Sequence, residues 1–138
     1  MTRRRGGGPA IALAMAVALL AGCSSMLGPR VTVQNEMTVP LTVEANGHWI
    51  GTVGPGASAT LGFALGDGQT SIMARTPTGA VVADLLGTNA MIEDAMAGTG
   101  VMAAWQDVAC GRVLLAIEPF DGSGVPPAPE GVAGAECP

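Results

Sequence analysis

The chain has 138 residues, 49% of them hydrophobic and only 12% charged, with a formal net charge of −5. It contains no lysine, and three of its six basic residues are Arg3, Arg4 and Arg5. A chain so poor in cations lacks the basic patch that phosphate backbones require, so nucleic acid is not an expected partner.

Residues 1–22 have the layout of an export signal. Three arginines precede an uncharged, mostly apolar run from Ala10 to Ala21, which has twelve residues. This run is too short for a membrane-spanning helix, which needs about 20 apolar residues. A buried core helix is the alternative, but it explains neither the preceding arginines nor the small residues that follow. A twin-arginine export route stays open, although RRRGGG lacks the rest of that pattern.

The run ends in Leu20-Ala21-Gly22-Cys23. Here the chain resembles bacterial lipoproteins, whose signal peptides end in an aliphatic residue, two small residues and a cysteine. The resemblance implies that Cys23 is the lipid attachment site. Its thiol would receive a diacylglyceryl group, the chain would be cleaved after Gly22, and the new amine would usually take a further fatty acid such as palmitate. Two or more acyl chains anchor a protein stably. We therefore expect the protein to be anchored to the outer face of the cell membrane, or to an outer membrane if the host has one.

The mature chain divides into a lipidated tether (23–29), a domain (30–120) and a flexible tail rich in proline and glycine (121–138). Removing 22 residues leaves 116, the size of one domain, and a net charge near −8. The six tether residues 24–29 reach at most about 20 Å, which keeps the domain close to the membrane. An acidic domain gains nothing from anionic headgroups, so the lipid must provide the anchoring.

Short runs with period-two alternation fill residues 30–120, and turn signals separate them. Asn46-Gly47 is the strongest hairpin signal among them. The expected strands are VTVQNE (31–36), LTVEA (41–45), HWIGTV (48–53), ASATLGFAL (57–65), TSIMAR (70–75), AVVADLL (80–86), VMAAWQDVAC (101–110) and RVLLAIE (112–118). The sequence therefore predicts an all-β fold, a single immunoglobulin-like β-sandwich of seven or eight short strands. A small barrel is the alternative.

Residues 88–100 (TNAMIEDAMAGTG) break this rhythm, because their apolar residues recur at helical spacing. Asn89 is a candidate N-cap and Gly98 a candidate C-terminal stop. We expect one short helix or ordered loop near 89–97.

Residues 31–65 and 71–85 resemble small, mostly uncharacterised bacterial secreted β-sandwich modules of the immunoglobulin-like and PEGA-like kind. The shared pattern is a valine-rich strand, an Asn-Gly hairpin, a turn of the form G-x-V-x-P-G-x-S and a strand leading to A-R-T-P-x-G. These motifs only mark where strands and turns occur, so the resemblance implies a fold and identifies no functional residue.

Cys110 and Cys137 remain once Cys23 is acylated. Two cysteines in an exported chain most often pair, and closing a loop of about 27 residues would stabilise the fold by about 3.5 kcal/mol on the chain-entropy model. The alternative is a free buried thiol at Cys110 and an unpaired Cys137.

No catalytic constellation can be assembled, so we expect no enzyme and no cofactor. His48 is the only histidine, lies just after a hairpin turn and is expected to be solvated. Zinc lacks ligands. A small-ligand or copper(I) carrier using His48 and the five methionines of residues 30–120 (Met37, Met73, Met91, Met96 and Met102) is a weak alternative, because methionine is more often core filler.

The remaining candidate site is a partner surface made by Trp49, Met91, Met96 and Trp105, since aromatic residues and methionine are enriched at interfaces. Burial of these side chains under the sandwich is the simpler expectation. The sequence favours a non-catalytic binding or assembly module for another envelope protein. A structural surface protein without a discrete partner is the alternative.

Overall fold

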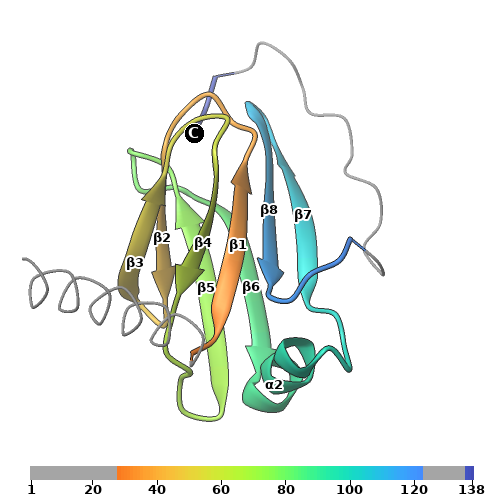
Figure 1. Ribbon diagram of the computed structural model, residues 1–138. Helices are drawn as coiled ribbons and strands as arrows, with labels where there is room; N and C mark the ends of the chain where they lie inside the picture. Colours follow the sequence, from red (N-terminus) through yellow and green to blue (C-terminus); the bar gives the residue numbers. More distant parts are fainter. Residues whose placement is uncertain (1–27, 123–135) are drawn as a thin grey trace, which may run out of the picture.

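The computed structural model describes residues 28–122 and 136–138. The predicted signal peptide, Cys23 and most of the tether lie outside the described residues, as do residues 123–135 of the predicted flexible tail. The described chain forms eight strands and one helix (Figure 1). The strands are β1 (Arg30–Asn35), β2 (Leu41–Ala45), β3 (His48–Val53), β4 (Ser58–Gly62), β5 (Gln69–Arg75), β6 (Val81–Thr88), β7 (Ala103–Val108) and β8 (Gly111–Ile117), and the helix is α2 (Asn89–Ala97).

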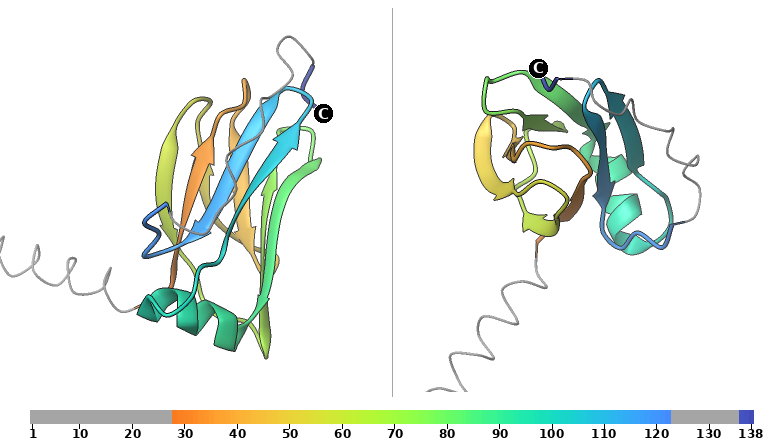
Figure 2. Two further views of the ribbon diagram at one scale, coloured as in Figure 1. Left: turned by 90° about the vertical axis from the view of Figure 1, so that its right-hand side faces the viewer. Right: turned by 90° about the horizontal axis from the view of Figure 1, so that it is seen from above.

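The strands form two antiparallel sheets that pack face to face (Figure 2). One sheet has the order β4-β1-β8-β7 and the other the order β3-β2-β5-β6. Each pair β2–β3, β5–β6 and β7–β8 is a hairpin within one sheet, and the other connections cross between sheets. The all-β sandwich is thus confirmed, immunoglobulin-like in the broad sense of two packed antiparallel sheets. The eight strands do not close into one barrel.

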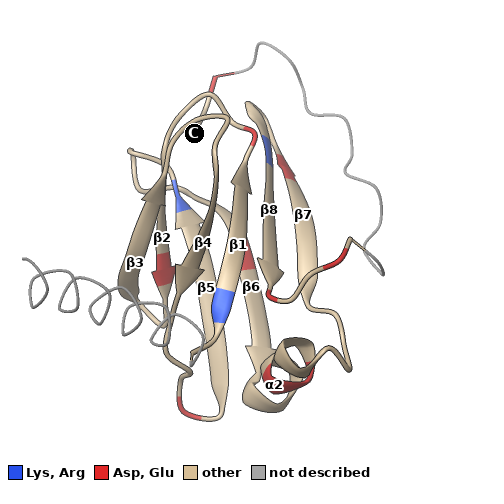
Figure 3. Ribbon diagram, viewed as in Figure 1, with Lys and Arg blue, Asp and Glu red and all other residues tan. Residues whose placement is uncertain are grey.

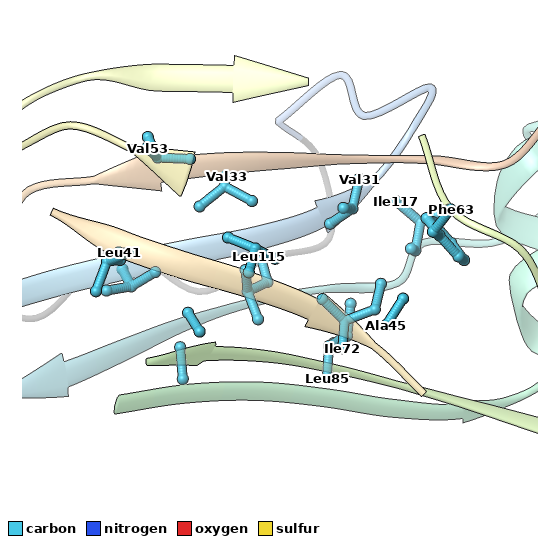
Figure 4. Close-up of a cluster of buried hydrophobic side chains, with 14 of the residues drawn as sticks. Val31, Val33, Leu41, Ala45, Val53, Phe63, Ile72, Leu85, Leu115 and Ile117 are labelled. Atoms are coloured by element: carbon cyan, nitrogen blue, oxygen red, sulfur yellow. The ribbon is translucent and has the colours of Figure 1, made fainter. Parts of the chain in front are cut away.

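Period-two alternation places one side of each sheet in the core (Figure 4). Val31 and Val33 of β1 and Leu41 and Val43 of β2 have no exposed surface, whereas the intervening threonines are half-buried. Burial of such side chains contributes about 1.5–3 kcal/mol each before entropy is counted. The core between the sheets is therefore mainly aliphatic, as its composition predicts.

The hairpin β2–β3 contains a β-bulge that sets the direction of Trp49. Asn46 and Gly47 both have positive φ, 52° and 81°, as the Asn-Gly signal predicts. The register then shifts between Val43 and Glu44, so that Glu44 faces Trp49, Val43 faces Gly51 and Ile50 is the extra residue. One extra residue reverses the alternation of the strand. As a result Gly51 is buried and the indole of Trp49 is exposed.

The helix α2 lies at the predicted position, but its cap differs from the prediction. Thr88 is the N-cap, and its hydroxyl accepts a hydrogen bond from the amide of Met91 (3.2 Å). Asn89 instead donates to the carbonyl of Gly66 (2.8 Å), which ties the helix to the β4–β5 connection. Gly98 ends the helix with φ 78°, a left-handed conformation that suits glycine, as predicted.

The sandwich has two distinct ends, which we call the tether end and the far end (Figures 1 and 2). At the tether end the described chain starts at Gly28, α2 lies across the ends of the strands, and Phe63 donates a backbone hydrogen bond to Pro29 (3.1 Å). The far end holds the β1–β2 connection and the β7–β8 turn. Cys110 in that turn forms a disulfide with Cys137.

Candidate partner surface

The structure distributes the predicted partner residues over three places rather than one patch. Trp49 lies on edge strand β3, and Trp105 lies on β7, an edge strand of the other sheet. Met91 and Met96 lie on α2. Met91 is exposed and Met96 half-buried, so the expected burial holds for only part of the set. A single surface made from all four residues is therefore not present.

Trp49 is the most exposed large hydrophobic residue of the described chain, with 66% of its surface accessible. Its indole nitrogen lies 3.4 Å from the hydroxyl oxygen of Thr52, on the same outer face of the β3-β2-β5-β6 sheet. By register, Trp49 faces Glu44, and Glu44 faces Met73 on β5. We call this surface the Trp49 face and define it as Trp49, Thr52, Glu44, Met73 and Arg75.

Polar contacts hold the middle of the Trp49 face in place. Arg75 donates from Nε to a carboxylate oxygen of Glu44 (3.1 Å) and from another guanidinium nitrogen to the carbonyl of Gly79 (3.1 Å). A further guanidinium nitrogen lies 3.9 Å from the Met73 sulfur. The ion pair is partly solvent-exposed, so its own contribution to stability is small, about 0–1 kcal/mol. Its effect is to fix side chains beside an exposed indole.

Trp105 is less available than Trp49. The guanidinium carbon of Arg112 lies 5.5 Å from the centre of the Trp105 ring, a cation–π arrangement. Arg112 is also ion-paired with Glu36. The side chain of Trp105 is half-buried, and its register neighbour Leu114 is buried although it faces outward. Trp105 is therefore part of the packing of the far half of its sheet.

His48 is exposed, as its place after the hairpin turn predicts. It lines an open hollow of about 470 Å³ between the start of β3 and residues 62–66, together with Ile50, Phe63 and Leu65. Asn46 also lines this hollow, and its side chain accepts a hydrogen bond from the amide of Ser71 (3.0 Å) and donates one to the carbonyl of Ala64 (3.2 Å). The lining contains no methionine, so the hollow lacks the sulfur ligands that copper(I) favours.

Within residues 28–122 and 136–138, no group of three or more histidine, cysteine, aspartate or glutamate side chains is arranged to hold a metal ion. In the same part of the chain, no helix is long and apolar enough to cross a membrane. Cys110 is buried and disulfide-bonded, so it offers no thiolate for nucleophilic chemistry.

Two surface features were missed by sequence reasoning. Leu86 and Val101 are exposed beside α2, at 59% and 51%. The Gln106 side chain pairs with the backbone of Asp84, donating to its carbonyl (2.5 Å) and accepting from its amide (3.1 Å). This contact covers the backbone of edge strand β6, where an unpaired strand invites association. Only cross-sheet geometry reveals it, because Gln106 and Asp84 belong to different sheets.

Comparisons with family models, curated proteins and solved structures find no match for this chain. The resemblances to bacterial lipoproteins and to secreted sandwich modules therefore rest on the sequence motifs alone.

Proposed function

We propose that this protein is an exported lipoprotein, anchored through Cys23, whose sandwich is a non-catalytic binding or assembly module of the cell envelope. Its partner is another envelope protein, and the Trp49 face is the surface that binds it. The lipobox motif Leu20–Cys23 at the end of a signal-like segment supports the anchor. The described structure supports the choice of surface.

The exposure of Trp49 carries this proposal. An indole with two thirds of its surface in water forgoes a large hydrophobic gain, and tryptophan is enriched among the residues that dominate binding energy at interfaces. Trp49 also lies on a sheet face whose neighbouring side chains are already fixed by the Glu44–Arg75 pair. Fewer side chains then lose freedom on binding, which lowers the entropic cost of association.

Two alternative functions receive less support. A structural surface protein without a partner does not account for a tryptophan with 66% of its surface exposed beside the Glu44–Arg75 ion pair. A copper or small-ligand carrier would use the hollow beside His48, whose lining offers one imidazole and no thioether. Metal analysis of protein isolated from its native membrane tests this second alternative.

Photo-crosslinking in the native membrane tests the binding function. A photoreactive residue replaces Thr52, which is exposed and adjacent to the Trp49 indole, so that Trp49 itself stays in place. The matched control carries the probe at Thr60, an exposed threonine on the outer face of the other sheet. We expect a discrete crosslinked species from Thr52 and none from Thr60, and we expect Trp49→Ala to abolish it. A folded, lipidated protein that gives no adduct at Thr52 would contradict the proposal.

A further inference from the structure

The tether end carries three exposed apolar side chains, Leu86, Met91 and Val101, which together we call the apolar corner. Their exposed fractions are 59%, 51% and 51%. Each of them lies near Gly87, either along the chain or in space. Leu86 precedes it in the chain, the Cβ of Met91 lies 3.8 Å from the position that a Cβ on Gly87 would take, and Val101 precedes Met102, whose side chain covers Gly87. Exposed apolar side chains that gather at one end of a domain are candidates for protein or membrane contacts.

The length of the tether decides which end of the sandwich meets the bilayer. Four residues lie between Cys23 and Gly28, so the chain from Cys23 to Gly28 makes five steps and reaches at most about 17 Å. The longest strand, β6, has eight residues and therefore spans about 26 Å between the two ends. If the far end rested on the membrane, the tether would have to bridge more than its full length. Gly28 starts at the same end as the apolar corner, so this end lies nearest to the lipid (Figure 2).

The charges of the tether end select the kind of lipid. Glu93 and Asp94 are exposed on α2, and Asp67 is exposed in the β4–β5 connection at the same end, where Arg30 begins β1 (Figure 3). Carboxylates within a Debye length of about 8–10 Å are repelled by anionic headgroups. Zwitterionic headgroups expose cationic groups to water and carry no net charge, so they impose no such repulsion.

We infer that the apolar corner rests in the headgroup region of the bilayer, with zwitterionic phospholipid as its ligand. This inference rests on the proposed anchor at Cys23, and it fixes the orientation of the domain. Leu86, Met91 and Val101 contact the lipid interface, α2 lies along the membrane surface, and the far end with its disulfide points away. The Trp49 indole extends toward Thr52, away from the tether end, and stays accessible to a partner.

The test is spin labelling of the full lipidated chain in phosphatidylcholine vesicles. Ala97 of α2 and Ala57 at the far end are both exposed alanines, so Ala97→Cys and Ala57→Cys form a matched pair. The label reaches only the introduced thiol, because Cys23 is acylated and the other two cysteines are disulfide-bonded. We expect a several-fold lower collision rate with a water-soluble nickel chelate at residue 97 than at residue 57.

Further variants show whether the apolar corner makes the contact. Met91→Ser combined with Val101→Ser should remove the difference between the two label sites. Val81→Ser, which removes the exposed apolar residue at the opposite end of β6, should leave it unchanged. Adding phosphatidylglycerol should weaken the protection of residue 97 at low salt. Salt of about 1 M, where the Debye length is about 3 Å, should restore it.

Each other outcome overturns the inference in a recognisable way. Equal accessibility at residues 97 and 57, in protein whose mass shows the lipid, rejects the docking but leaves the anchor intact. A mass without lipid on Cys23 rejects the proposed anchor, and the docking falls with it. Protection of residue 97 in native membranes but not in vesicles shows that a protein, not lipid, covers the apolar corner.

Discussion

Replacing Asn35 by alanine should be among the most damaging polar substitutions in the described chain. Asn35 is 1% exposed at the end of β1. Its amide nitrogen donates to the carbonyls of Val39 (2.9 Å), Val53 (3.1 Å) and Gly54 (3.0 Å), and its carbonyl oxygen accepts from the amide of Met37 (2.9 Å). One side chain thus holds the β1–β2 connection against the end of β3.

The magnitude follows from counting these bonds. Each hydrogen bond contributes about 0.5–1.5 kcal/mol net, and a buried group left without a partner costs more than an accessible one. The bonds to Val53 and Met37 are buried, while the carbonyls of Val39 and Gly54 are only part-buried and can be rehydrated. Asn35→Ala should therefore lower the free energy of unfolding by about 3 kcal/mol. For a domain of this size the melting temperature should fall by about 15–20 °C.

Asn35→Asp separates hydrogen bonding from packing, because the two side chains have the same shape. The carboxylate still accepts from the Met37 amide but faces three carbonyl oxygens that it cannot satisfy, so the pKa of the new carboxyl is raised above its ordinary value near 3.9. A group whose pKa is raised on folding stabilises the fold below the unfolded pKa and loses that effect as pH rises through the folded pKa. The variant should thus be closer to the parent at about pH 4 than at about pH 7.

Urea unfolding of the parent, both Asn35 variants and Gln34→Ala measures these effects. Gln34 is the adjacent amide, half-buried on the outer face, and its loss should cost less than about 1 kcal/mol. If Asn35→Asp were as stable as the parent at neutral pH and gained nothing on acidification, the assigned hydrogen bonds would be wrong.

Three other substitutions test separate parts of the account. Replacing both Cys110 and Cys137 by serine removes a cross-link between residues 27 apart, and should lower the unfolding free energy by about 3.5 kcal/mol; no change in urea midpoint relative to the oxidised parent would refute the pairing. Gly111→Ala introduces a Cβ at φ 144° against the backbone of the β1–β2 connection and should cost at least about 2 kcal/mol, whereas Gly54→Ala, which meets no atom within 4 Å, should change the urea midpoint little. Cys23→Ala should release the protein from membranes in a fractionation experiment, and an unchanged membrane fraction would reject the anchor.

The positions of strands and turns could be predicted because local chemistry determines them. Alternating valine and threonine define β1, and Asn46-Gly47 defines the first hairpin because both residues tolerate positive φ. Gly98 ends α2 for the same reason. Such signals depend only on residues close in sequence, so the amino-acid pattern alone is enough to predict the all-β fold and its single helix.

The direction of Trp49 could not be predicted, because it depends on a strand pairing. The sequence HWIGTV alternates too weakly to show that Ile50 is an extra residue, and only the register with β2 reveals the bulge. The predicted N-cap, Asn89, was wrong by one residue for a similar reason. Asn89 is a good capping residue in isolation, but its amide binds Gly66 across the tether end, and Thr88 takes its place.

The candidate surfaces needed the tertiary fold throughout. The sequence gives no reason to expect different environments for Trp49 and Trp105, yet in the fold the guanidinium of Arg112 lies over the ring of Trp105. Leu86 and Val101 belong to sequence runs that predict core strands. Leu86 is exposed because it lies on the outer side of β6 between buried Leu85 and Gly87, and Val101 is exposed because it precedes β7.

The mass of the N-terminal peptide of the protein, extracted from its native membrane with detergent, tests the central claim most directly. The membrane anchor and the proposed membrane orientation both depend on the Cys23 lipid. The account predicts a mature chain that starts at Cys23 and carries a diacylglyceryl group, with a further acyl chain on the amine. A peptide in which Cys23 is unmodified, or in which residues before it are retained, would contradict it.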